Sequence, residues 1–230
     1  MLETKNIVKT YKSGDVETSV LKGVNFKAND GEFIAIMGRS GAGKSTLMYQ
    51  MSLLDEPTSG EVIISGQQGG EMNEKEKAAF RLNKFGYVFQ DYALLPELTA
   101  LENVAIPLLM QGHEQKKAFF LATDALERVG LGKRLGNLPS QLSGGEQQRV
   151  SISRAIAHKP SVLFADEPTA NLDRISSSMV MKIFEDLHRQ GQTIIMVTHE
   201  EEYGRLAERV VYLDEGMVVS TEEHIKHHRP

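Results

Sequence analysis

The chain has 230 residues, of which 40% are hydrophobic, so it is long enough to bury a sizeable core as one domain or as two small ones. Its 26 basic and 31 acidic residues give a net charge of −5, which does not indicate general nucleic-acid affinity. The absence of cysteine excludes disulfides, Cys-ligated zinc and thiol chemistry. Because the N-terminus lacks a signal-peptide core and no stretch approaches the ~20 apolar residues of a membrane span, we expect a soluble chain.

The first 35 residues predict antiparallel β-structure. Short strands are expected at residues 6–11, 18–21 and 24–27. Clusters of turn-forming residues at 13–15 and 28–31 separate them, as in β-hairpins.

A glycine-rich segment after the apolar run 33–37 predicts a phosphate site. We call it the glycine turn, and it comprises Gly38, Arg39, Ser40, Gly41, Ala42, Gly43, Lys44, Ser45 and Thr46. Apolar residues at helical spacing follow it, so the order is strand, turn and helix start. In that context the backbone N–H groups converge on one concavity, Lys44 reaches the β- and γ-phosphates, and Ser45 offers its hydroxyl to Mg²⁺. We therefore expect a nucleoside triphosphate here.

Residues 91–157 predict an all-helical insert within an α/β chain. A strand is expected at 85–90, and helical patches are expected around 101–111, 115–129 and 146–157, broken by proline and glycine residues that include Pro107. The insert contains a second glycine-rich turn, Leu142–Gln147, which we call the signature turn. The hydroxyl of Ser143 and the N–H groups of Gly144 and Gly145 form a second candidate anion site, and Ser143 with Glu146 also predicts a capping box.

The strand pattern resumes at 161–165 and ends in two adjacent carboxylates. In open α/β sheets ligands lie outside the carboxyl ends of the strands, so Asp166 is placed to hold Mg²⁺ through water and Glu167 to polarise an attacking water. A helix follows with one apolar stripe that comprises Ile175, Met179, Val180, Ile183, Phe184 and Leu187. A buried strand at 193–198 and a hairpin formed by 209–213 and 217–220 complete a mostly parallel sheet.

Six motifs in the same order and spacing make the sequence resemble the ATP-binding subunit of an ABC transporter along nearly its whole length. They are the glycine turn, Gln90, the signature turn, and the segments 164–169, 170–173 and 197–199. The resemblance implies a P-loop NTPase core with a mostly parallel sheet, an N-terminal antiparallel β-subdomain and an all-helical insert. It implies one ABC ATPase domain over residues 1–230, with a nucleotide-binding core at 1–90 and 158–230 and a helical subdomain at 91–157.

The resemblance also implies roles for matching residues around ATP and Mg²⁺. Tyr11 would stack on adenine, and the glycine turn would hold the phosphates. The implied catalytic residues are Glu167 as the base, His199 at the γ-phosphate, Lys44 and Gln90, and the implied Mg²⁺ ligands are Ser45, Gln90 and Asp166. Ser143, Gly144, Gly145 and Glu146 would face the γ-phosphate of ATP held by another copy, with Asp173 at that interface.

The segments 87–96, 98–104 and 166–173 resemble the branch that contains lipoprotein-releasing, macrolide-exporting and cell-division ATPase subunits. That branch implies a head-to-tail homodimer whose closure drives integral membrane permease subunits. We expect these permeases to dock near Gln90 to Leu109, which places the chain in the cytoplasm on the inner face of the membrane. No nucleic-acid partner is expected.

Other functions remain open at this point. The same ATPase switch would also suit a regulator of a non-transport transmembrane complex. A DNA-maintenance ATPase needs long coiled-coil arms, whereas only about 100 residues separate Lys44 from Ser143. A small-molecule kinase leaves the signature turn unexplained. The cargo is not specified by this chain, and the histidine-containing tail 224–230 is read either as a polar tail or as a metal site.

Overall fold

The computed structural model describes residues 1–14 and 16–223. Asp15, in the predicted turn 13–15, and the histidine-containing tail 224–230 lie outside the described residues. The chain divides into two units, one formed by residues 1–78 with 191–230 and the other by residues 79–190. The boundaries between these two units differ from the predicted subdomain boundaries at residues 90 and 158, which stay a prediction.

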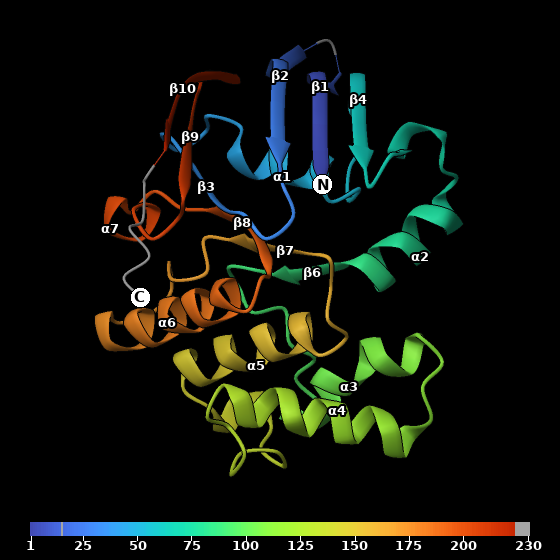
Figure 1. Ribbon diagram of the computed structural model, residues 1–230, viewed down its shortest axis with the longest axis vertical. Coiled ribbons are helices and arrows are strands. Elements are labelled where there is room, and N and C mark those ends of the chain that lie inside the picture. The colour runs from blue at the N-terminus through green and yellow to red at the C-terminus, as the bar shows by residue number, and fades with distance from the viewer. Residues whose placement is uncertain (15, 224–230) are drawn as a thin grey trace. The chain divides into compact units, whose positions relative to one another are not determined.

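The first unit contains an antiparallel sheet in the order β2-β1-β4-β5 and the strands β10-β9-β3-β8 (Figure 1). Its elements are β1 (Leu2–Ser13), β2 (Val16–Ala28), β3 (Phe33–Met37), α1 (Lys44–Met51), β4 (Ser59–Ile64), β5 (Gln67–Gln68), the 3₁₀ turn Gly69–Glu71, β8 (Thr193–Val197), α7 (Glu201–Gly204), β9 (Arg209–Asp214) and β10 (Met217–Glu223). The helix α2 (Glu74–Lys84) begins in this unit and ends in the other.

The central strand β3 positions the glycine turn. It runs parallel to both β8 and β9, with Ile36 opposite Val197 and Val211. Every residue of β3 and β8 is buried, which explains why both strands are apolar along their whole length. The segments that follow β3 and β8 consequently leave the sheet at the same carboxyl edge.

The N-terminal strands are longer than predicted. Residues 18–21 and 24–27 belong to one strand, β2, which pairs with β1 along its whole length. Gly23 has φ 86° and lies beside the side chain of Asn6, at an irregularity in the register between the two strands. The gap between the two predicted strands, at residues 22–23, therefore lies at a bulge within the hairpin.

The second unit contains the helical insert. Its elements are β6 (Phe85–Val88), α3 (Ala100–Met110), α4 (Gln115–Arg128), the 3₁₀ turn Pro139–Gln141, α5 (Gly144–Ile156), β7 (Val162–Asp166) and α6 (Arg174–Arg189). The strands β6 and β7 are parallel neighbours. Figure 1 shows α3, α4 and α5 grouped together, and they share a core that includes Val104, Leu108, Ala122 and Val150. The predicted helices at 101–111, 115–129 and 146–157 are confirmed.

Two predictions about these helices are wrong. Pro107 lies inside α3 and does not break it, because proline costs the helix one backbone donor without preventing the last turn from forming. On α6, Ile175 and Met179 are 75% and 43% exposed, whereas Val180 and Phe184 are fully buried. At about 100° per residue, Ile175 and Met179 lie roughly opposite the buried row, which also includes Met181, so the buried face is displaced from the predicted apolar stripe.

Within the described residues, none of the helices has both the length and the apolar character that crossing a bilayer requires.

Candidate functional site

The glycine turn has a backbone that only glycine accommodates at its first position. Gly38 follows β3 directly, and a Cβ atom there would lie 2.0 Å from the carbonyl oxygen of Leu213. Gly43 has φ 97°, a left-handed conformation that L-residues rarely adopt, and it is the N-cap of α1. No side chain caps α1, so backbone N–H groups and the positive end of the helix dipole lie at the turn. This is the geometry of a phosphate site.

Lys44 is held in place before any ligand binds. Its side chain is 6% exposed, and Nζ donates hydrogen bonds of 3.0 Å to the carbonyl oxygens of both Gly38 and Arg39. The ammonium is therefore fixed across the mouth of the turn. A positive charge at this point is placed to meet the negative oxygens of a polyphosphate.

The hairpin β9–β10 forms backbone hydrogen bonds that stabilise the glycine turn. Its Gly216 donates its N–H to the carbonyl oxygen of Ala42 at 3.1 Å, and its own carbonyl accepts from the N–H of Lys22 at 2.9 Å. The turn is thus tied to β2 and to the C-terminal hairpin. The sequence did not predict these hydrogen bonds, because they join segments that lie far apart in the chain.

His199 lies at the same sheet edge as the glycine turn. It follows β8, the parallel neighbour of β3, and its residue is exposed. The preceding Thr198 accepts a hydrogen bond at Oγ1 from the N–H of Glu200 at 3.1 Å, which fixes the turn after the strand. His199 and Gly38 therefore follow neighbouring strands at the same sheet edge.

Tyr11 is a partly exposed ring with a fixed orientation. It is 43% exposed, and its hydroxyl donates to Oδ2 of Asp55 at 2.8 Å. Nζ of Lys9 lies 4.8 Å from the ring centre and also donates to Asp55 at 2.7 Å. Burial and Asp55 raise the pKa of Tyr11. Burial opposes ionisation of Asp55, but hydrogen bonds from Lys9, Tyr11 and Gln50 hold its pKa below the usual value. Sequence reasoning identified the ring but missed Lys9 and Asp55.

The second unit brings Gln90, Asp166 and Glu167 to one strand edge. Val88 of β6 pairs with Ala165 of β7, so the residues that follow both strands emerge together. Asp166 is buried at 7% exposure, and Gln90 is exposed. Glu167 has φ 43°, an uncommon conformation for a residue other than glycine. Carboxylate and amide oxygens are the donors that Mg²⁺ accepts, so this set fits the metal.

The segment after Gln90 is held by its neighbours. Tyr92 and Ala93 have φ values of 63° and 48°. Arg154 of α5 donates through Nη2 to the carbonyl oxygen of Tyr92 at 2.9 Å and through Nη1 to that of Ala93. Asn171 donates through Nδ2 to the carbonyl oxygen of Gln90 at 3.0 Å. These contacts link the segment to α5 and to the residues before α6.

The signature turn is a capped helix start, as predicted. Oγ of Ser143 accepts from the N–H of Glu146 at 3.3 Å, and Oε2 of Glu146 accepts from the N–H of Ser143 at 2.9 Å. Ser143 is exposed, so its hydroxyl and the helix N-terminus remain open to an anion. Gly145 packs against α6, where a Cβ atom would lie 2.6 Å from Oγ of Ser176. A larger residue would push the turn away from α6.

Asp173 caps α6 next to the signature turn. Its carboxylate accepts from the N–H groups of Ile175 at 2.9 Å and Ser176 at 3.0 Å, and from Oγ of Ser176 at 2.7 Å. The backbone and hydroxyl of Ser176 lower the pKa of Asp173. Asp173 is exposed, so it lies on the surface while it fixes the residue against which Gly145 packs.

The predicted site residues thus fall into two sets. The first unit holds the glycine turn, Tyr11 and His199, and the second holds Gln90, Asp166, Glu167 and the signature turn.

Comparison with known proteins identifies close relatives. The family model described as ABC transporter matches residues 21–170. An uncharacterized ABC transporter ATP-binding protein of Methanocaldococcus jannaschii is 48% identical over 95% of this chain and 98% of its own length. The lipoprotein-releasing system ATP-binding protein LolD of Aquifex aeolicus is 46% identical over 95% of this chain and 96% of its own length. The macrolide export protein MacB of Chlorobaculum tepidum is 46% identical, and the match spans 34% of it.

Solved structures agree with these relatives. The dimeric, post-hydrolysis structure of the ATP-binding cassette MJ0796 with ADP and Pi has a TM-score of 0.91 at 39% identity. The match covers 97% of this chain and 98% of that one. The chain therefore has the predicted α/β fold of ATP-binding cassettes. The relatives favour a transporter subunit over the non-transport regulator and the DNA-maintenance ATPase.

Proposed function

Because this chain belongs to the ABC transporter family as an ATP-binding subunit that hydrolyses ATP, we propose that two copies close head to tail around two ATP molecules. One observation carries the proposal. The described chain has two candidate anion sites of different construction, the glycine turn before α1 and the exposed signature turn at the start of α5. A head-to-tail pair uses both, because each ATP then lies between the glycine turn of one copy and the signature turn of the other. The dimeric structures of the similar cassette MJ0796 support this arrangement.

In each copy the first unit binds the nucleotide. The glycine turn from Gly38 to Thr46 surrounds the phosphates, with Lys44 on the β- and γ-phosphates. Tyr11 stacks on adenine, and its hydrogen bond to Asp55 keeps the ring from rotating. Since Lys44 and Tyr11 are already fixed by neighbours, little side-chain order has to be gained on binding.

We expect Ser45, Gln90 and Asp166 to supply oxygen donors to Mg²⁺, because hydroxyl, amide and carboxylate oxygens are the ligands that this ion prefers. When bound, the ion neutralises charge on the β- and γ-phosphates. Asp166 is buried at a strand end and Gln90 is at the neighbouring strand end, so both donors belong to rigid elements. This rigidity suits an ion that demands regular octahedral geometry.

Hydrolysis depends on positioning and on charge. Glu167 orients the attacking water and accepts its proton, while Lys44 and His199 stabilise charge on the γ-phosphate. From the other copy, Ser143, Gly144 and Gly145 donate to that phosphate, and Glu146 holds the turn in shape. Loss of the γ-phosphate removes the link between the copies, so the dimer opens.

The specific ATPase activity of the isolated subunit is expected to rise with protein concentration. A single copy holds only half of each site, so it binds ATP but hydrolyses it poorly. Steady-state turnover should be measured over a wide range of subunit concentration at saturating ATP and Mg²⁺. A specific activity that is the same at all concentrations would overturn the proposed dimer.

The helical subdomain, residues 91–157, carries the surface for a membrane permease. The segment from Gln90 to Leu109 presents apolar side chains, of which Leu95 is 47% exposed and Pro96 is also exposed. Arg154 and Asn171 form hydrogen bonds with the first residues of this segment. A conformational change at the ATP site would therefore displace the segment as a rigid element, together with any permease helix bound to it. The core then comprises 1–90 and 158–230, and the chain works on the cytoplasmic face of the membrane. The relatives named for lipoprotein release and macrolide export support an assignment to the export branch.

A Leu95→Cys variant is expected to crosslink to the permease. The natural chain has no cysteine, so the new thiol is unique. Membranes from cells that make the whole complex would be treated with a thiol-to-amine crosslinker and analysed for a larger adduct. Asp124→Cys, on the exposed side of α4, is the matched control. Equal adducts from both variants, or none from Leu95→Cys, would contradict docking at this segment.

A further inference from the structure

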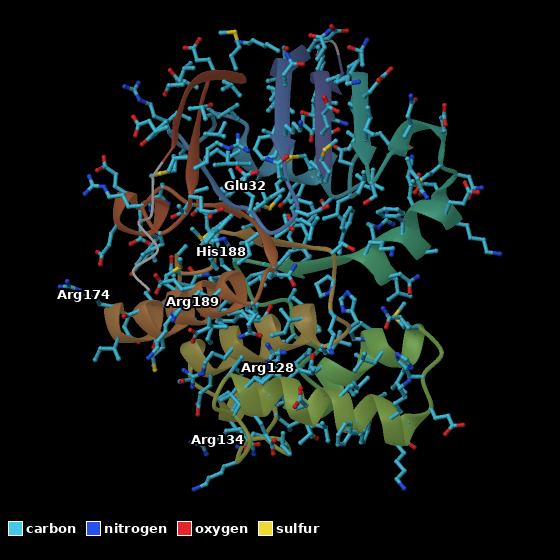
Figure 2. All side chains as sticks on the ribbon, in the orientation of Figure 1. Glu32, Arg128, Arg134, Arg174, His188 and Arg189 are labelled. Atoms are coloured by element: carbon cyan, nitrogen blue, oxygen red, sulfur yellow. The ribbon has the colours of Figure 1, made fainter. Side chains whose placement is uncertain are left out.

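Arg134 contacts the signature turn although no part of the proposed mechanism uses it. It lies on the loop after α4, where Figure 2 labels it. Its Nε donates to Oε1 of Glu146 at 3.0 Å. Glu146 is the third residue of α5, in the first turn whose N-terminus is proposed to face an ATP phosphate.

Both carboxylate oxygens of Glu146 are in use. Oε2 accepts from the N–H of Ser143 at 2.9 Å, and Oε1 accepts from Arg134 at 3.0 Å. The side chain of Glu146 is 19% exposed, whereas that of Arg134 is 50% exposed. The hydrogen bond from the N–H of Ser143 and then the contact with Arg134 lower the pKa of Glu146. Glu146 therefore carries a negative charge at neutral pH.

The negative charge of Glu146 would weaken the binding of ATP at the signature turn. The signature turn has to receive a triphosphate, and a negative charge in the first turn repels it. The helix dipole offsets only part of that charge. Arg134 supplies a full positive charge at hydrogen-bond distance, so the pair is neutral as a unit.

The loop that carries Arg134 is itself fixed. The carbonyl oxygens of Leu135 and Asn137 accept from the N–H groups of Leu101 at 3.0 Å and Ala100 at 2.8 Å, the first residues of α3. The N–H of Arg134 donates to the carbonyl oxygen of Leu131 at 2.8 Å. Arg134 thus approaches Glu146 from an anchored backbone, which reduces the entropy lost in holding the pair.

We propose that Arg134 is a positioning residue that neutralises and orients Glu146, so that the signature turn accepts the γ-phosphate of ATP bound to a second copy. The inference rests on the proposed head-to-tail dimer. Arg134 does not touch the nucleotide in this scheme. It acts through Glu146, and its effect is on closure of the dimer and not on ATP binding by one copy.

The test compares how ATPase activity depends on subunit concentration in charge variants. Arg134→Gln should raise the concentration for half-maximal specific activity about tenfold, since an unneutralised like charge at an interface costs that much or more. Arg134→Lys should stay within about threefold of the parent, because it keeps the charge.

Lys133→Gln is the matched control. Lys133 is an exposed neighbouring cation with no ion pair in the described part of the chain, so its loss should change the half-maximal concentration less than twofold. Binding of a fluorescent ATP analogue to dilute subunit should be the same in all variants, which shows that each one folds. An Arg134→Gln chain that behaves as the parent, or an Arg134→Lys chain as weak as Arg134→Gln, would overturn the inference alone. A parent without concentration dependence would instead overturn the proposed dimer.

Discussion

The Glu167→Gln variant is expected to lose ATP turnover and to accumulate as a dimer with ATP bound. Glutamine keeps the shape of the side chain but does not accept a proton from water. General-base catalysis contributes about 10²- to 10⁴-fold to such rates, so turnover should fall by at least that range. Because the γ-phosphate is retained, the link between copies persists. Steady-state turnover and sedimentation velocity with ATP and Mg²⁺ would measure the two effects.

Asp124→Asn removes a carboxylate from an exposed position on α4 and serves as the control for charge. It should hydrolyse ATP at the parent rate and show no trapped dimer. Near-parent turnover in Glu167→Gln would remove Glu167 as the base. A variant that is inactive yet monomeric with ATP would contradict the γ-phosphate as the link between copies.

The backbone around Glu167 makes this substitution a chemical test and not a structural one. Glu167 is in a left-handed conformation that costs about 1–3 kcal/mol and persists only where surroundings impose it. Its carbonyl oxygen accepts from the N–H of Ala170 at 3.2 Å. The next residue, Pro168, accepts from Nε2 of the fully buried Gln148 at 2.7 Å. These contacts do not involve the carboxylate, so glutamine should leave them intact.

The features that were predictable from the sequence depend on neighbouring residues. The glycine turn, the capping box of Ser143 and Glu146, and the buried strands β3, β7 and β8 each arise from contiguous residues whose pattern is itself the physical cause. Two of the insert helices, α3 and α5, begin at the capping residues Thr99 and Ser143. The resemblance to a family added roles that no local pattern contains, such as those of Tyr11 and His199.

The features that were not predictable join distant segments. Asp55 was not identified from the sequence, yet its carboxylate accepts the hydrogen bond that orients Tyr11 across 44 positions of sequence. Arg154 was not identified from the sequence either, yet it donates hydrogen bonds to the carbonyl oxygens of Tyr92 and Ala93. Arginine is common on helix surfaces, so its pairing with a backbone oxygen is visible only once the chain has folded. The buried face of α6 was likewise not predictable from the sequence, because its position depends on the segments that pack against the helix.

The Lys44→Met variant is expected to bind ATP far more weakly and to lose hydrolysis. Methionine keeps most of the side-chain volume but removes the ammonium that donates to the carbonyl oxygens of Gly38 and Arg39. Removing one partner of a desolvated charge pair costs about 2–4 kcal/mol, which is roughly 30- to 700-fold in Kd. Titration with a fluorescent ATP analogue would give the Kd, and circular dichroism without nucleotide would show that the subunit folds.

Lys75→Met provides the matched control, because it removes the same charge from an exposed position on α2 within the same unit. Its Kd for ATP should stay within about twofold of the parent, since isolated exposed charges contribute little. Equal weakening in both variants would mean that net charge, and not the fixed position of Lys44, governs binding. Parent-like affinity in Lys44→Met would mean that the backbone N–H groups of the glycine turn hold the phosphates unaided. The proposal instead requires the fixed ammonium, because the helix N-terminus supplies only about half an elementary charge against a triphosphate.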